Sequence, residues 1–477
     1  MDVLPPSVRR AERWELVNPC KWPSLSYSDL LKPPSRLKHK DSVTMRNTPL
    51  LSETDAFDLH AAQLRGKKLA FRERLAAGAA QALAIAAPDR PVWMRCVLGA
   101  DGREVELIDP DTQLPRKYLN FGSNNYLGLT SHPVVLRKVR EAVECYGSGT
   151  PGSSLLNGYS RVHRELEERL ARLKGKEAAV LFSSGYAANV GIVSALLTDA
   201  DVAVFDQLAH ASLWDGLKLS GASRNRRFRH NDAQDLDLVL EEETGVRDKF
   251  VAVEGIYSMD GDAAPLDAIV PVCKKHGAIL ILDDAHATGV MGEGGHGSAE
   301  HFGVEKDIDV VMGTLGKALG AIGAFAAGER DLVEYLRFFA RSYIFSTALP
   351  PAVVGAALGA LDVMEREPEH RLHLTAMIRR ATEGLAPFGL MTRPAGCIIA
   401  LRAPEWLDAR RAVRLFERAG LFMNYVMFPA VPVAQQRLRI SISAWHTEAD
   451  VDRLIAVVDE VWATCRMEAH PPAVAGI

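Results

Sequence analysis

Short apolar segments that alternate with helical segments are the feature that most constrains the fold of this chain. They span residues 178–182, 202–205, 250–253, 278–282 and 310–312. Strands that are apolar on both faces are typical of a parallel sheet covered by helices on both sides. We therefore expect an α/β protein with a mainly parallel central sheet, whose functional groups gather where the strands end.

The pattern divides the chain into three predicted regions. Residues 1–116 form an N-terminal extension, with an alanine-rich helix and a β-hairpin over residues 92–108. Residues 117–350 form the central α/β domain. Residues 351–477 form a smaller α+β C-terminal domain, which ends in an amphipathic helix that begins after Thr447.

Composition and charge argue against several classes of protein. A net charge of −4 over 477 residues offers no basic surface for nucleic acid. No stretch approaches the roughly 18 apolar residues of a membrane span, and we expect no signal peptide. The six cysteines form no Cys-x-x-Cys pair, so neither a zinc site nor a disulfide framework is expected, and the cytoplasm is the expected location.

The alanine-rich helix of the extension has a basic face, made by Arg65, Lys67, Lys68, Arg72 and Arg74. Such a face could dock an acidic acyl-carrier protein. Charge runs more often mark only a solvated surface, so docking is a hypothesis here.

Lys317 is the centre of the predicted chemistry. It lies in the small-residue run 313–320, directly after the last apolar strand. A lysine amine becomes a good nucleophile in a desolvated or electropositive pocket, although a lysine between glycines is more often part of a surface turn. Asp283 ends an upstream strand. This arrangement suits pyridoxal phosphate, whose aldehyde a lysine holds as a Schiff base and whose pyridine nitrogen a carboxylate keeps protonated.

Two further strand ends carry candidate cofactor ligands. Ser184, Gly185 and Tyr186 stand between a strand and a helix, where free backbone N–H groups and the helix dipole favour a phosphate. His210 also follows a strand and can lie flat on a cofactor ring. A turn of this kind and a lone histidine often have no ligand, so their place in the series of strands carries the prediction.

Other interpretations of nearby motifs are weaker. Asp283 and Asp284 could together bind Mg²⁺, but no phosphate-activating lysine motif accompanies them. His286, three residues after Asp283, can instead reach the phenolic oxygen of the cofactor ring. The glycine-rich run 292–297 matches the dinucleotide fingerprint, yet the βαβ unit that should follow is missing. We interpret it as a chance match.

From Leu119 to Trp462 the chain resembles the α-oxoamine synthases of fold-type I pyridoxal phosphate enzymes. This family includes serine palmitoyltransferase, 8-amino-7-oxononanoate synthase, glycine C-acetyltransferase and 5-aminolevulinate synthase. The resemblance rests on motifs in the expected order, at residues 124–129, 184–189, 210–212, 254–262, 283–289, 314–317 and 437–441. Together these motifs are highly specific.

The resemblance implies a role for each candidate at the cofactor. Lys317 would carry pyridoxal phosphate and remove the α-proton of the amino acid. Asp283 would pair with the pyridine nitrogen, and His210 would stack on the ring. His286 and Ser258 would contact the phenolic oxygen.

The resemblance also implies phosphate and substrate contacts. The phosphate would be held by Ser184, Gly185, Tyr186 and Thr314 and, from the neighbouring subunit of a homodimer, by Ser346 and Thr347. Arg439 would clamp the amino-acid carboxylate through its bidentate guanidinium, with Asn125 nearby.

The implied reaction is a decarboxylative condensation. Serine, glycine or alanine would react with an acyl thioester of coenzyme A or of an acyl-carrier protein, to give an α-amino ketone, CO₂ and a free thiol. Ser154 stands where many bacterial relatives have an arginine, so the role of that arginine is in doubt here. The run 155–158 resembles the corresponding loop of soluble bacterial serine palmitoyltransferases, which favours a long or unusual acyl group.

Two other functions fit part of the pattern. An aminotransferase or aldolase of the same fold type would share Lys317 and Asp283 but release no CO₂, and the complete motif set argues against it. A non-catalytic scaffold subunit of an oxoamine synthase typically lacks the lysine, which this chain has. The acyltransferase is therefore the preferred hypothesis.

Overall fold

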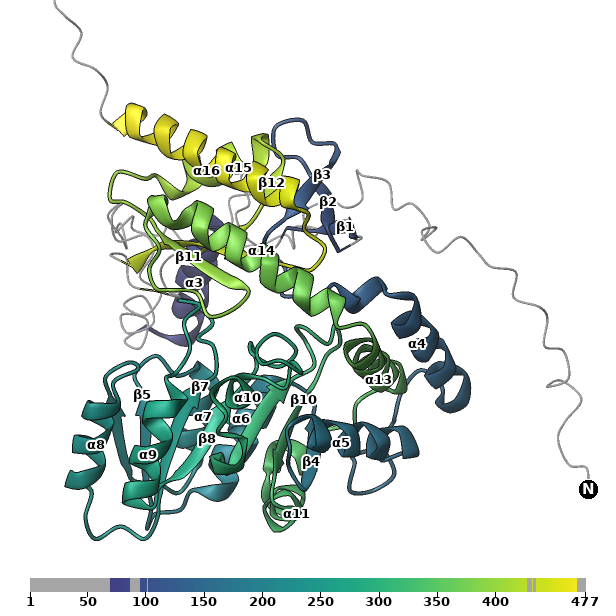
Figure 1. The fold of residues 1–477 in the computed structure, drawn as a ribbon, viewed down its shortest axis with the longest axis vertical. Helices are drawn as coiled ribbons and strands as arrows, with labels where there is room; N and C mark the ends of the chain where they lie inside the picture. The colour runs from purple at the N-terminus through teal and green to yellow at the C-terminus, as the bar shows by residue number, and fades with distance from the viewer. Residues whose placement is uncertain (1–68, 86–94, 101, 427–430, 432–434, 470–477) are drawn as a thin grey trace, which may run out of the picture. The chain divides into compact units, whose positions relative to one another are not determined.

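The predicted apolar strands all lie in one seven-stranded sheet (Figure 1). The computed structural model describes residues 69–85, 95–100, 102–426, 431 and 435–469. The strands of the sheet are, in spatial order, β4 (Ala178–Phe182), β10 (Ala324–Gly328), β9 (Val310–Thr314), β8 (Ile279–Asp283), β7 (Lys249–Glu254), β5 (Val202–Asp206) and β6 (Arg224–Phe228). Only β10 runs antiparallel to its neighbours, so the prediction of a mainly parallel sheet is confirmed.

Helices cover both faces of this sheet (Figure 1). One face packs against α6 (Gly185–Leu196), α7 (Ala211–Leu219) and α11 (Arg330–Phe339). The other face packs against α8 (Ala233–Glu242) and α9 (Leu266–His276). Alternate residues of the central strands enter the two cores, which explains why these strands are apolar at nearly every position.

The N-terminal strands form a second sheet with a late segment of the chain. Its order is β1 (Val97–Ala100), β2 (Glu104–Ile108), β3 (Pro115–Asn120) and β12 (Leu421–Phe422). The antiparallel pair β1–β2 confirms the described part of the predicted hairpin. The predicted alanine-rich helix is described as α3 (Phe71–Ile85), and its earlier part lies outside the described residues.

The C-terminal section contains a three-stranded antiparallel sheet and long helices. The sheet has the order β11 (Ile398–Arg402), β14 (Arg437–Ser441) and β13 (Asn424–Val426). The helices here are α13 (Pro351–Arg366), α14 (Glu369–Leu385), α15 (Ala409–Arg418) and α16 (Glu448–Ala469). Thr447 caps α16 as expected, because its hydroxyl accepts from the backbone N–H of Asp450 at 3.2 Å. The region limits at residues 116 and 350 remain predictions.

Shorter elements join these parts. They are α4 (Pro133–Tyr146), which packs along α13, α5 (Arg161–Leu173), α10 (Ser298–Phe302), α12 (Arg341–Ile344), and the 3₁₀ turns η2 (Leu129–Ser131), η3 (Glu305–Asp307) and η4 (Ala386–Phe388). Among the helices that the structure describes, none has both the length and the apolar character needed to cross a membrane.

We predict that Gly128→Ala destabilises the protein. Gly128 has a left-handed backbone with φ of 71°, and an added Cβ would lie 1.9 Å from Trp445 Nε1. Backbone strain of about 1 kcal/mol and overpacking of about 1–3 kcal/mol add up to a clear fall in the thermal midpoint of unfolding. Gly245→Ala is the matched control, because its φ is 69° and no atom lies within 4 Å of the added Cβ. Equal losses in the two variants would contradict the packing argument.

Candidate active site

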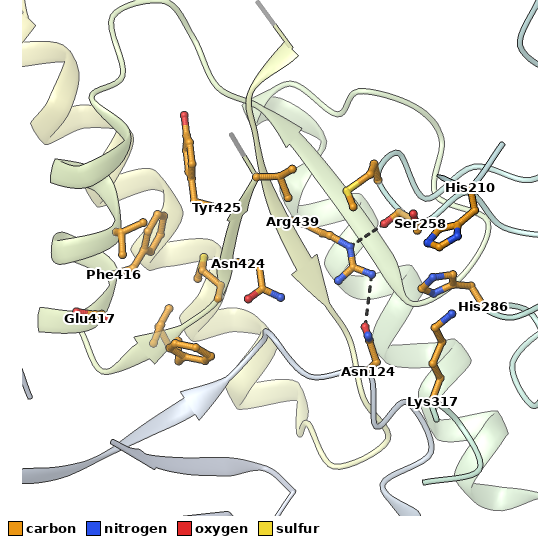
Figure 2. Close-up of a pocket in the computed structure, with 16 residues that line it drawn as sticks. Asn124, His210, Ser258, His286, Lys317, Phe416, Glu417, Asn424, Tyr425 and Arg439 are labelled. Carbon is orange, nitrogen blue, oxygen red and sulfur yellow. Dashed lines mark hydrogen bonds between the residues drawn. The ribbon is translucent and has the colours of Figure 1, made fainter. Parts of the chain in front are cut away.

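The carboxyl ends of the parallel strands open onto one cavity of about 800 Å³. Its polar side is formed by Asn124, His210, Ser258, His286, Lys317 and Arg439 (Figure 2). Its apolar side is formed by residues of α15, β12 and β13 and by Met423 between the two strands, with Phe416, Leu421 and Tyr425 among them. The ends of the parallel strands bring four of the predicted site residues together, namely His210, Ser258, His286 and Lys317, and β14 of the C-terminal sheet adds Arg439.

Lys317 follows β9, and its amine reaches the polar side of the cavity (Figure 2). Burial disfavours the ammonium form and lowers its pKa to about 8, against the opposing charges of Asp283 and Glu254. The cation of Arg439 lowers it further. The amine therefore has a neutral, nucleophilic fraction near neutral pH, as a nucleophilic lysine requires.

Asp283 is a buried carboxylate at the end of β8, with 4% of its surface exposed. It accepts hydrogen bonds from the side-chain amide of Asn189 at 2.7 Å and from the backbone N–H of Ala285 at 3.1 Å. Donors of this kind stabilise the ionised form. Asn189 ends the motif 184–189, but its role as the partner of Asp283 depends on the packing of α6 against the sheet.

The neighbouring Asp284 faces different partners. Its carboxylate pairs with the buried amine of Lys174 at 2.6 Å and accepts a hydrogen bond from the hydroxyl of Ser298 at 2.5 Å. Both of its oxygens are thus engaged away from Asp283. The two aspartates do not form a shared Mg²⁺ site, and the preference for a cofactor over a metal at Asp283 stands.

His286 is buried against the hydroxyl of Tyr126, with an O–Nδ1 distance of 2.8 Å. Burial lowers the pKa of His286 well below its usual value, and the nearby cations of Lys317 and Arg439 act in the same direction. The ring is therefore neutral, with Nε2 left for a ligand. Tyr126 also donates to the side-chain oxygen of Asn124 at 3.2 Å, which connects His286 to the loop before η2.

Glu254 is a second buried carboxyl group, in register with Asp283 on the adjacent strand β7. Burial raises its pKa well above the usual value, and the charge of Asp283 raises it further. Burial and the neighbouring Asp283 thus favour the protonated form of Glu254. This effect is not visible in the sequence, because it depends on the pairing of β7 with β8.

Arg439 lies on β14 and is 7% exposed. Its Nε donates to the carbonyl of Ser258 at 2.7 Å, and its Nη1 donates to the hydroxyl of Ser441 at 3.1 Å. Nη2 lies 3.4 Å from the side-chain oxygen of Asn124 (Figure 2). No carboxylate among the described residues forms an ion pair with Arg439, whereas Arg437 on the same strand is paired with Asp260. The guanidinium of Arg439 can therefore receive an anionic substrate group.

The predicted phosphate-binding segment has the expected geometry at a helix start. Ser184 caps α6 by accepting from the backbone N–H of Ala187 at 3.1 Å. An added Cβ at Gly185 would lie 3.8 Å from the hydroxyl of Thr314, so these two residues are neighbours. Tyr186 is half exposed and donates to Asp215 at 2.6 Å. None of these residues lines the cavity itself.

Three other predicted residues also lie away from the cavity of the described chain. Ser346 and Thr347 follow α12 and line a separate small space. Asn125 uses its side chain within its own loop, where it donates to Thr130 at 2.8 Å and accepts from the backbone of Leu129 at 3.0 Å. Its neighbour Asn124 lines the cavity instead.

We predict that the amine of Lys317 titrates near pH 8, well below an exposed lysine. The rate of its modification by a neutral acylating reagent, followed by peptide mass spectrometry, should rise through a midpoint close to 8. Asp283→Asn should lower this midpoint further, because the anion of Asp283 raises the pKa of Lys317. The exposed Lys306 is the internal control in the same digest. A midpoint near that of Lys306 would contradict the desolvation argument.

Comparisons with known proteins agree with this geometry. Residues 116–458 match the family model described as aminotransferase class I and II. An 8-amino-7-oxononanoate synthase of Geobacter sulfurreducens is 43% identical over 370 residues, covering 76% of this chain and 90% of that protein. A protein of the same name from Cellvibrio japonicus is 42% identical, covering 72% and 87%.

Solved structures give the same relationship. A serine palmitoyltransferase of Sphingomonas wittichii has a TM-score of 0.78 and 34% identity, covering 84% of this chain and all of that one. The serine palmitoyltransferase of S. paucimobilis, solved with a PLP–myriocin aldimine, has a TM-score of 0.78 and 31% identity, and also covers 84% of this chain and all of that one. The 8-amino-7-oxononanoate synthase of Francisella tularensis has a TM-score of 0.62 and 27% identity, covering 74% and 98%. The chain belongs to the aminotransferase class I and II family and, within it, to the pyridoxal phosphate-dependent α-oxoamine synthases.

Proposed function

We propose that this protein condenses a small amino acid with an acyl thioester, with loss of CO₂, at the cavity around Lys317. One observation carries the proposal. A single cavity brings together an amine of lowered pKa, a neutral histidine and an unpaired arginine, in front of a buried carboxylate. A bound amino acid needs each of these groups if its α-proton is to be removed while its carboxylate is held.

The residues present suit pyridoxal phosphate. Asp283 is an anion stabilised by two donors and would face the pyridine nitrogen. His210 would stack on the ring, and His286 and Ser258 would contact its phenolic oxygen. The phosphate would be held at the start of α6 by Ser184, Gly185 and Tyr186, with Thr314 beside them. When bound, the protonated ring accepts the electron pair left at Cα, which makes both deprotonation and decarboxylation possible.

The chain's own residues supply binding and proton transfer. Arg439 would hold the amino-acid carboxylate through a charge-assisted hydrogen bond, with Asn124 and Asn125 nearby. Lys317 would take the α-proton, since a pKa of about 8 leaves part of the amine neutral at physiological pH. The apolar side of the cavity would receive the acyl chain and keep water away from the reacting carbon.

Two classes of relative suggest different substrates. A product named 8-amino-7-oxononanoate carries its amine beside a terminal methyl group, as alanine would leave it, whereas serine palmitoyltransferases are named for serine and a long acyl group. Alanine, serine and glycine are therefore the proposed first substrates. The proposed acyl donor is a thioester of coenzyme A or of an acyl-carrier protein. The described cysteines are free thiols, in keeping with a reducing cytoplasm as the proposed location.

A homodimer with shared active sites is also part of the proposal. Large side chains are exposed around α11 and α12, with Phe338 at 60%, Phe339 at 56% and Phe345 at 72%. Clustered exposed aromatic residues of this size favour a protein interface. Ser346 and Thr347 follow directly after Phe345 and would complete the phosphate site of the neighbouring subunit.

Lys317→Ala should abolish condensation while the protein keeps its fold. The assay follows free thiol and CO₂ from each amino acid with acyl-coenzyme A and with acyl-carrier protein, and the visible spectrum is titrated with glycine, alanine and L-serine. One amino acid should shift the cofactor band saturably in the wild type, which names the first substrate. Lys306→Ala is the control on an exposed lysine and should retain full activity. Product formation by Lys317→Ala would refute the proposal.

Mixing two inactive variants tests the shared site. Lys317→Ala and the double variant Ser346→Ala/Thr347→Ala should each be inactive alone. After unfolding and refolding together at equal concentration, half of the dimers are mixed and each has one intact site of two, so about a quarter of wild-type activity should return. If no activity returns although mixed dimers form, Ser346 and Thr347 do not serve the neighbouring subunit.

A further inference from the structure

His230 lies outside the cavity, between the fully buried carboxylate of Asp206 and the partly buried carboxylate of Asp262. Its Nδ1 is 3.0 Å from Asp206 Oδ1, and its Nε2 is 2.9 Å from Asp262 Oδ2. Since a carboxylate faces each ring nitrogen, both nitrogens carry a proton and the ring is a cation. Burial opposes this charge, but the hydrogen bonds to the two aspartates outweigh it and raise the pKa of His230 to about 10.

Asn231 strengthens the bridge that His230 forms between Asp206 and Asp262. Its backbone N–H donates to Asp206 Oδ2 at 2.9 Å, and its side-chain amide donates to Asp262 Oδ2 at 3.0 Å. Its φ of 57° lies in the left-handed region, which asparagine tolerates better than most non-glycine residues. Two consecutive residues thus connect the same two carboxylates.

Asp206 connects this bridge to His210. It ends β5, is fully buried, and accepts from the backbone N–H of Leu208 at 2.8 Å. The backbone N–H of Ala209 donates to the Asp206 carbonyl at 3.0 Å. These bonds shape the turn 207–209, which places His210 at the cavity.

Asp262 connects the bridge to Ser258. The loop 257–262 is closed by backbone bonds, from Tyr257 N–H to the Asp262 carbonyl at 2.8 Å and from Gly261 N–H to the Tyr257 carbonyl at 2.9 Å. The Tyr257 ring meets the ring of His230 edge-on, with centroids 4.4 Å apart. Ser258 lies within this loop, and its carbonyl accepts from Arg439.

We propose that His230 is a positioning residue, whose cation between Asp206 and Asp262 fixes the loop of Ser258 relative to the turn of His210. It touches neither cofactor nor substrate and acts through the residues on both sides of the cavity. The inference rests on the proposed function, because that proposal places His210 on the cofactor ring and Ser258 at its phenolic oxygen. Without the cation, two carboxylates would repel each other across the gap and the two segments would separate.

The test is the affinity of His230→Gln for pyridoxal phosphate, measured by equilibrium dialysis. Loss of the cation, and with it of two charge-assisted hydrogen bonds, should weaken binding about tenfold or more. The pH at which the absorption band of the bound cofactor titrates should also move, since Ser258 and His210 would leave their places. A purely structural role would lower the thermal midpoint of unfolding without moving this titration.

Matched variants keep the test decisive. Asp262→Asn removes only the carboxylate on the side of the loop 257–262, and it should also weaken cofactor binding. This variant keeps the inference testable if His230→Gln does not fold. His276→Gln is the control, because it removes a histidine that pairs with Asp237 at 2.5 Å on α8 and α9, and neither residue lines the cavity. Cofactor affinity and titration equal to those of His276→Gln would overturn the inference. Cofactor binding does not require condensation, so an enzyme that binds the cofactor but forms no product would refute the proposed function alone.

Discussion

The anion of Asp283, buried at the end of β8, is the charge around which the rest of the site is arranged. Burial alone would make such a group neutral, so the structure surrounds it with the amide of Asn189, the N–H of Ala285 and the nearby amine of Lys317. Burial raises the pKa of Glu254, one strand away. The charges of Asp283 and Glu254 oppose the desolvation that would otherwise lower the pKa of Lys317 further.

The loop 257–262 joins the central sheet to the small C-terminal sheet. On one side Asp262 is tied to His230 and Asn231, at the end of β6. On the other side Arg437 pairs with Asp260 and Arg439 donates to Ser258. The two arginines on β14 thus act differently. Arg437 holds the loop through the carboxylate of Asp260, whereas Arg439 lines the cavity and has no carboxylate partner among the described residues. The position of Arg439 relative to Lys317 and His286 in the cavity depends on these contacts.

The sequence was most informative where a signal is local. Strands β5, β7, β8 and β9 were predictable because they are apolar at almost every position, and Lys317 and Asp283 were found at their ends. Strand β6 (Arg224–Phe228) lies at the edge of the sheet and consists mainly of arginines, so it lacks the apolar pattern that predicts the other strands. Strand β10 consists mainly of alanine and glycine and has weak strand propensity. The partners of the site, such as Asn189 and Tyr126, come from distant segments that meet only in the fold.

The pairing of β3 with β12 has a consequence for how the chain is made. Leu119 pairs with Leu421, so one edge of the N-terminal sheet stays open until about 300 more residues have left the ribosome. An unpaired edge strand is a template for wrong association, and contacts this far apart in sequence form slowly. During synthesis this edge of β3 is therefore open to wrong association until the short strand β12 covers it.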